Sequence, residues 1–179
     1  MDPRIMGAAR RACAGLTVGF ALALGTAGCR KPPTPTSQHA ATLDRLAALA
    51  GDWEGTTGSG KTIRVHYDVI AERSVVAETY TTPSGRVSMS MYHADGPTVM
   101  VTHYCAQKNQ PRLREESAGA DSNTVRFSFL DATGMSSPAD AHMTQLVMQF
   151  ADPDHFTQTS TYQEKKERET TSIHFARKR

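Results

Sequence analysis

The sequence lacks the complete motifs of the common enzyme and metal-binding classes. Its 179 residues contain no Gly-rich phosphate-binding loop, no paired-carboxylate motif and no His-Glu-x-x-His sequence. Glu54, Asp68 and Glu78 lie on predicted strands, but spacing alone assembles no nucleophile, base and orienting group around them. The sequence therefore predicts no catalytic residue and no cofactor, and an enzyme stays among the alternatives.

A surplus of charge is also missing. The chain carries 20 Lys and Arg against 18 Asp and Glu, a formal net charge of +2 at pH 7. Three of these arginines and one aspartate precede residue 29, so a chain without that segment carries 17 residues of each sign. A basic surface of the kind that binds nucleic acid is therefore not expected.

A long hydrophobic run is absent, but a short one stands near the N-terminus. Arg4, Arg10 and Arg11 precede residues 12–24, which are mostly apolar and uncharged. A helix that crosses a bilayer needs about 20 apolar residues, and glycine and threonine interrupt this run. Thr26-Ala27-Gly28 then stand directly before Cys29. The segment resembles a bacterial lipoprotein export signal, although Thr26 replaces the branched apolar residue usual at the first lipobox position.

This resemblance implies that residues 1–28 are a removed signal peptide and that Cys29 carries the lipid. Several acyl chains hold a protein on a membrane far more firmly than one chain does. Arg30, rather than aspartate, follows the cysteine, which favours the outer membrane, facing the periplasm. An ordinary cleaved signal and a retained short anchor are the alternatives.

Few cysteines remain for a disulfide in the exported chain. The sequence has three, and the resemblance implies that Cys13 is lost and that Cys29 is lipidated. Cys105 then has no intramolecular partner. We expect it to be buried, bound to another molecule or paired between molecules.

The rest of the chain divides into a tether and one domain. Residues 29–38 contain three prolines and form an extended tether behind the anchored cysteine. Residues 40–50 carry leucines and alanines at helical spacing, and Gly51 follows them as a stop signal. This pattern predicts one short amphipathic helix. The folded domain is expected over residues 39–179.

From Gly51 onward the apolar period is two, and turn residues divide the chain regularly. Ten strands are predicted, at 52–57, 61–70, 74–81, 86–93, 98–105, 111–117, 123–130, 143–150, 155–163 and 168–177. No helical pattern separates them, so the expected fold is all-β: a closed antiparallel meander β-barrel with one short N-terminal helix.

The pair Asp95-Gly96 predicts a type I′ hairpin in which Tyr92 lies opposite Val99. Alternation then separates the side chains of this hairpin into two faces. One face holds Met89, Met91, His93, Thr98, Met100, Thr102 and Tyr104, and the other holds Ser88, Ser90, Tyr92, Val99, Val101, His103 and Cys105. Both faces are partly apolar, so the sequence leaves open which one points inward.

The segment Gly51-Asp52-Trp53 at the first strand resembles the Gly-x-Trp of the calycin superfamily, the lipocalin and fatty-acid-binding-like barrels. In that superfamily a basic residue of the last strand often packs over the indole and closes one end of the barrel. Arg177, in Ile173-His174-Phe175-Ala176-Arg177, is the matching residue. Such a cation–π contact contributes about 0.5 to 2 kcal/mol.

A second segment, from Tyr92 to Pro111, resembles a motif of uncharacterised bacterial domains related to this superfamily. These two resemblances imply a fold and not an activity. By analogy with such barrels, and with the location that the export signal implies, we expect an envelope protein that binds a small apolar or amphipathic molecule in a barrel cavity. The predicted ligand-binding residues are Met89, Met91, Met100, His103, Cys105, Asn109 and Gln110. The sequence indicates no oligomeric state and no specific ligand.

Other function classes stay open. Nitrobindin-like barrels, also of ten strands, bind haem through a histidine of the last strand, and His174 matches it. Alternation instead points His174 outward, because Ile173 and Phe175 share a face with Arg177. A metal site at His103 and Cys105 needs two further ligands, so no metal is predicted. An envelope enzyme and a non-binding scaffold lipoprotein are the remaining alternatives.

Overall fold

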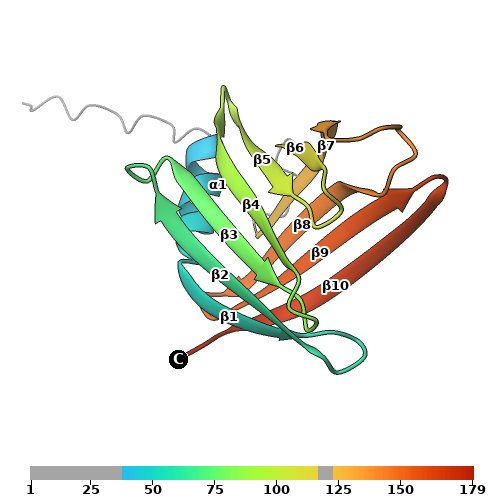
Figure 1. Ribbon diagram of the computed structural model, residues 1–179. Coiled ribbons are helices and arrows are strands. Elements are labelled where there is room, and N and C mark those ends of the chain that lie inside the picture. Colours follow the sequence, from blue (N-terminus) through green and yellow to red (C-terminus); the bar gives the residue numbers. More distant parts are fainter. Residues whose placement is uncertain (1–37, 117–122) are drawn as a thin grey trace, which may run out of the picture. The chain divides into compact units, whose positions relative to one another are not determined.

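The computed structural model describes residues 38–116 and 123–179, one helix and ten strands (Figure 1). The proposed signal and Cys29 lie outside the described residues. The elements are α1 (Gln38–Ala47), β1 (Gly51–Thr56), β2 (Thr62–Ile70), β3 (Val75–Thr81), β4 (Val87–Asp95), β5 (Thr98–Tyr104), β6 (Gln110–Glu115), β7 (Thr124–Thr133), β8 (His142–Asp152), β9 (His155–Glu164) and β10 (Glu167–Arg177). Among these residues, no helix has the length and apolarity needed to cross a membrane.

The strands form a closed antiparallel meander barrel. Each strand pairs with its neighbours in the sequence, and β10 pairs with β1 to close the sheet (Figure 1). Trp53 lies opposite Arg177 in this last pairing. The predicted fold class is therefore confirmed, and the predicted strands differ from the observed ones by a few residues at their ends.

The interior is built largely by alternation along the strands. In β2, Ile63, Val65 and Tyr67 are buried, whereas the residues between them point outward. Inward side chains of the other strands complete one core that includes Phe127, Leu146, Met148, Phe156 and Phe175. Burial of these side chains, at about 25 cal/mol per Å², supplies the main driving force for closure.

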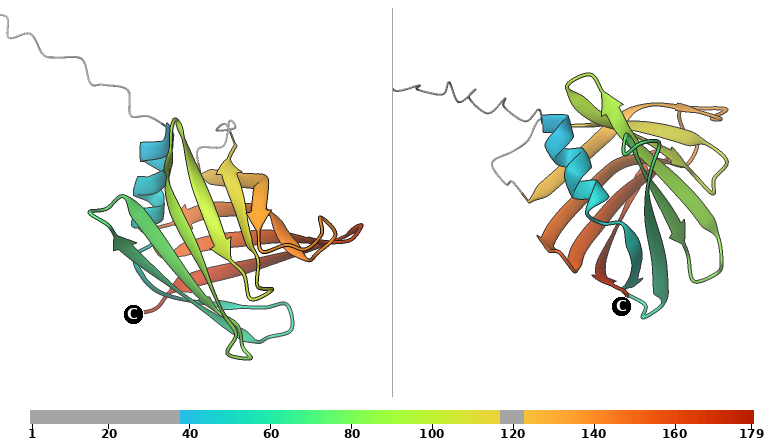
Figure 2. Two further views of the ribbon diagram at one scale, coloured as in Figure 1. Left: turned by 45° about the horizontal axis from the view of Figure 1, so that its top comes forward. Right: turned by 90° about the vertical axis from the view of Figure 1, so that its left-hand side faces the viewer.

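One end of the barrel is covered by α1 (Figure 2). Trp53 is 1% exposed, and its indole N–H donates to the carbonyl oxygen of Leu49 at 2.6 Å. The guanidinium carbon of Arg177 lies 4.2 Å from the centre of the indole ring, the arrangement that the sequence predicts. The same guanidinium donates to the carbonyl oxygens of Ala48 and Ala50. Arg177 therefore joins the last strand to the chain that leaves α1.

Gly55 permits a close approach at this closed end. A Cβ atom there would lie 2.6 Å from Cγ2 of Ile173 and 2.8 Å from Cδ1 of Phe175. Any larger residue would have to displace two buried side chains of β10.

The hairpin at Asp95-Gly96 differs from the prediction in its register. Asp95 lies opposite Thr98 and Tyr92 opposite Val101, so the two turn residues are Gly96 and Pro97. Gly96 has φ +58° and proline follows it, which fits a type II′ turn. Proline lacks the N–H that a paired strand position uses, and its φ suits the second turn position. The residue opposite Tyr92 is two positions further along the chain than predicted, Val101 instead of Val99. Because side chains alternate with a period of two, the predicted division of the hairpin into two faces is unchanged.

Candidate functional site

A cavity of about 550 Å³ opens at the barrel end away from α1, near the β3–β4, β5–β6 and β9–β10 connections (Figure 1). We name it the mouth cavity. Its wall includes inward residues near the ends of β3, β5, β8 and β9, among them Tyr80, His103, Met143, Gln158, Ser160 and Tyr162. Cys105 and the rim residues Arg86, Glu164, Glu167, Arg168 and Glu169 complete the opening.

A buried carboxylate lies beneath this cavity. Glu78 is 1% exposed and accepts hydrogen bonds from the hydroxyls of Tyr92 (2.6 Å) and Tyr67 (3.1 Å). Gln158 Nε2 donates to its other oxygen at 3.3 Å. Burial raises the pKa of Glu78, and hydrogen bonds from Tyr92, Gln158, Tyr67 and Ser90 act against that rise.

A neutral imidazole lies in the wall of the mouth cavity. His103 is 4% exposed, and burial lowers its pKa to about 4. Its Nδ1 lies 3.0 Å from the hydroxyl oxygen of Ser90, and its Nε2 lies 3.2 Å from that of Tyr162. A neutral imidazole has one donor and one acceptor nitrogen, so the two hydroxyls fill both roles.

Tyr162 extends this polar arrangement to the rim. Burial raises the pKa of Tyr162 above its ordinary value, and the neighbouring Cys105 thiol raises it further. The wall thus presents hydroxyl, imidazole, thiol and amide groups beside the apolar side chain of Met143. Such a wall offers several hydrogen-bonding groups and one apolar surface.

The predicted site residues divide into two groups in the structure. His103 and Cys105 both line the mouth cavity. Asn109 is 2% exposed and donates through Nδ2 to the carbonyl oxygen of Ala141, and Gln110 accepts a hydrogen bond from Thr133. Asn109 therefore joins the β5–β6 and β7–β8 connections, Gln110 joins β6 to β7, and neither lines the cavity.

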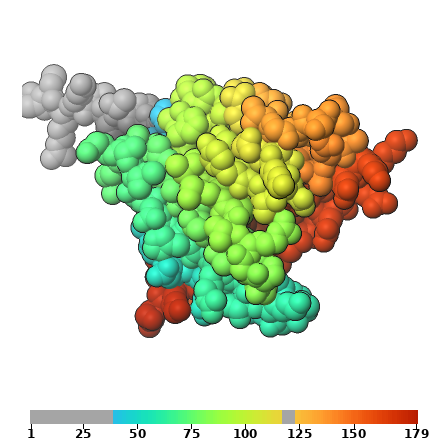
Figure 3. All heavy atoms as spheres, viewed as in Figure 1, coloured from blue at the N-terminus to red at the C-terminus, as the bar shows by residue number. Residues whose placement is uncertain are grey.

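Met89, Met91 and Met100 lie on the face of the hairpin opposite the core and do not line the mouth cavity, which corrects the expectation that they line an interior cavity. Met100 is nevertheless buried, at 6% exposed. Tyr92 and Val101, on the opposite face, are fully buried in the core. The outer surface of β4 and β5 appears in green to yellow-green in Figure 3, and Met89 is 39% exposed. Tyr92 packs against the ring of Phe127 in the barrel centre, and alternation then turns the methionines of the same two strands away from it.

The haem hypothesis based on His174 does not fit the structure. His174 is exposed on the outside of β10, and its Nδ1 lies 2.8 Å from the hydroxyl of Thr157. Ile173 and Phe175, on either side, are buried. In the described part of the chain, no three His, Cys, Asp or Glu side chains are grouped as a metal site requires.

Sequence reasoning missed the contribution of Gln158, Ser90 and Tyr162. A signal existed, because Phe156, Gln158, Ser160 and Tyr162 alternate along one predicted strand and change from apolar to polar. Glu78 stood on a predicted strand, but its burial follows only from the closure of the barrel.

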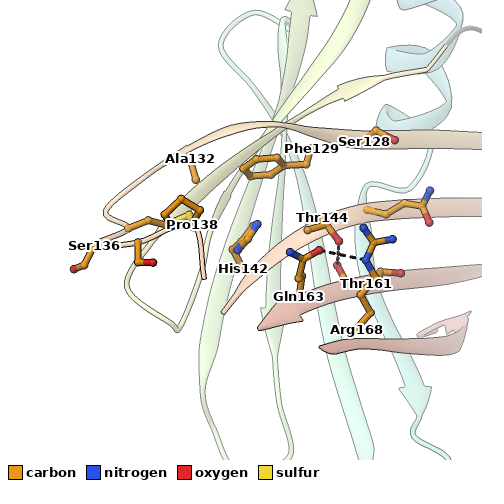
Figure 4. Close-up of a pocket in the computed structure, with 13 residues that line it drawn as sticks. Ser128, Phe129, Ala132, Ser136, Pro138, His142, Thr144, Thr161, Gln163 and Arg168 are labelled. Carbon is orange, nitrogen blue, oxygen red and sulfur yellow. Dashed lines mark hydrogen bonds between the residues drawn. The ribbon is translucent and has the colours of Figure 1, made fainter. Parts of the chain in front are cut away.

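A second hollow, of about 790 Å³, lies outside the barrel and is shown in Figure 4. The pairing of β7 with β8 ends at Ser128 and Gln145, so the two strands separate beyond that point. His142 and Phe129, whose ring centres are 4.9 Å apart, lie between them. Thr144 donates to the carbonyl oxygen of Thr161 across the wall of this hollow. It contains none of the predicted ligand-binding residues.

Comparison with known proteins adds little to this description. No protein-family model matches the chain, and no curated protein matches it. A solved structure of EF1p2_mFAP2b bound to DFHBI is similar at 13% identity with a TM-score of 0.36, over 77% of this chain and 98% of that one. A likeness this weak assigns neither a family nor a ligand. The architecture is a ten-stranded barrel of the kind expected from the calycin resemblance.

Proposed function

We propose that the protein binds a small amphipathic molecule in the mouth cavity. The observation that carries this proposal is the cavity itself, whose volume of about 550 Å³ suits a small organic ligand. Polar groups of His103, Tyr162 and Gln158 converge on it. The apolar half of the interior is filled by side chains, so the ligand is amphipathic rather than a long apolar chain.

Titration with the neutral naphthalene dye Prodan tests this proposal through its fluorescence. Ser160 lines the cavity, whereas Thr159 is its neighbour on the outside of β9. Ser160→Phe should fill the space and weaken Prodan binding at least about tenfold, a change of about 1.4 kcal/mol. Thr159→Phe adds the same ring outside and should leave binding unchanged. Equal binding by both variants would contradict an interior site.

The location proposed for this binding protein is the bacterial envelope, with a lipid on Cys29. The support is the run of small residues before Cys29 and the proline-rich segment after it. Metabolic labelling with a fatty acid should label the protein, and Cys29→Ser should abolish the label and the membrane-anchored form. An unlabelled natural chain contradicts the lipoprotein proposal and leaves the binding proposal intact.

A further inference from the structure

Gln158 leaves a buried oxygen without a partner beside the mouth cavity. The residue is 7% exposed and lines the cavity. Its Nε2 donates to Glu78, but its Oε1 is buried and has no hydrogen-bond partner within residues 38–116 and 123–179. Nearly all buried polar atoms of native proteins are paired. A water molecule or a donor on a bound molecule would pair this oxygen.

The hydrogen bond to Glu78 determines that Oε1, and not Nε2, of the Gln158 amide is available to a ligand. Rotation of the Gln158 amide by half a turn would bring Oε1 against the carboxylate of Glu78, so two acceptor oxygens would face each other. The hydroxyls of Tyr67 and Tyr92 already donate to Glu78. The hydrogen bond from Nε2 of Gln158 to Glu78 therefore leaves Oε1 as the free acceptor of the amide.

The charges around the cavity disfavour an anion. No lysine or arginine is among the buried residues of the described chain, whereas Glu78 is buried beneath the cavity. The rim carries Glu164, Glu167 and Glu169 against Arg86 and Arg168. The guanidinium of Arg168 also donates to Gln163 on the outside of β9. A carboxylate ligand would find excess negative charge and no buried cation.

The aromatic side chains of the wall suit a cation. Tyr80 and Tyr162 both line the cavity, and the faces of their rings attract ammonium groups. We infer that the ligand is a small organic amine, with its ammonium N–H groups directed to Gln158 Oε1 and its apolar body toward Met143. This inference rests on the proposed function, because it names the ligand class of the same cavity.

Three indole compounds with one shared body test the inference by displacement of bound Prodan at neutral pH. Tryptamine is a cation, tryptophol is neutral and indole-3-acetate is an anion. Tryptamine should bind at least about tenfold more tightly than tryptophol, a difference of about 1.4 kcal/mol, and indole-3-acetate should bind most weakly. Equal binding of all three, or tighter binding of indole-3-acetate, would overturn the amine assignment.

Two variants locate the preference at the amide and the carboxylate. Gln158→Leu removes the oxygen, and Glu78→Gln removes the charge but keeps groups that pair with Tyr67 and Tyr92. Both should reduce the ratio of tryptamine to tryptophol affinity to within about threefold, whereas the outside variant Thr159→Phe should keep it. An unchanged ratio in folded Glu78→Gln would contradict the inference even if Gln158→Leu does not fold.

The outcomes separate this inference from the proposed function. If Prodan does not bind the natural protein, or if Ser160→Phe does not weaken it, the proposed cavity function fails. If Prodan binds inside and the indole series shows no preference for the cation, only the amine assignment fails.

Discussion

The two halves of the barrel interior differ although the same strands build both. Toward α1, β9 contributes Phe156, which stacks on Phe175 and meets the edge of Trp53. Toward the mouth, the same face of β9 contributes Gln158 and Tyr162, which bond to Glu78 and His103. The closed half therefore supplies stability through packing, and the mouth half holds polar groups that a simple core would exclude. A chain selected for stability alone has no need of that second arrangement.

The closed half should be the most sensitive to truncation. Trp53→Ala should lower the free energy of unfolding by about 3–5 kcal/mol, because it leaves a cavity under Arg177 and removes contacts to Phe156. Urea denaturation followed by circular dichroism measures the loss. A loss below about 1 kcal/mol would contradict the role assigned to the closed end.

Acid should weaken the mouth half through His103. Its pKa is about 4 in the folded protein and 6.5 ordinarily, so the unfolded chain binds more protons between these values. Stability is therefore lost as the pH falls from 6.5 toward 4, by about 3 kcal/mol in total. In His103→Gln this part of the acid dependence should vanish, which urea titrations at pH 7 and pH 4.5 can compare. Parallel losses in both proteins would show that His103 is not the group responsible.

Glu78 should act in the opposite direction. Burial raises its pKa in the folded state, so the folded protein binds more protons and its stability falls as the pH rises above the ordinary value of 4.5. Glu78→Gln removes the titrating group, so the fall in stability between pH 5 and pH 8 should be smaller in this variant than in the natural protein. Thermal melts at pH 5 and pH 8 measure the change. A large destabilisation at pH 8 would mean that the charged form is needed for the fold.

The outer face should show the smallest effect. Met89→Ser replaces a side chain that is 39% exposed and should change stability by less than about 0.5 kcal/mol. Its effect on Prodan affinity should also be negligible, because the residue points away from the mouth cavity. Tenfold weaker Prodan binding in this variant would indicate that the ligand binds at the methionine face and not in the mouth cavity.

Local pattern was sufficient for the fold but not for the site. Alternation and turn residues predicted ten strands, because each strand has its own period and its own boundary signals. The inward face of β4 and β5 was not predictable, since Met91 and Tyr92 are both apolar and only packing selects between them. The pairing of Gln158 with Glu78 joins residues 80 positions apart, and no local signal records it. The sequence placed His103 and Cys105 on one face because they stand two apart on one predicted strand, and both line the mouth cavity.

The most direct test of the mouth cavity uses the Cys105 thiol. In a chain with Cys13→Ser and Cys29→Ser, Cys105 is the remaining cysteine, and it lines the cavity. Its alkylation by neutral iodoacetamide, followed by mass spectrometry, should slow at least about tenfold when Prodan occupies the cavity, and Ser160→Phe should remove that protection. An alkylation rate that saturating Prodan leaves unchanged would contradict binding in the barrel mouth.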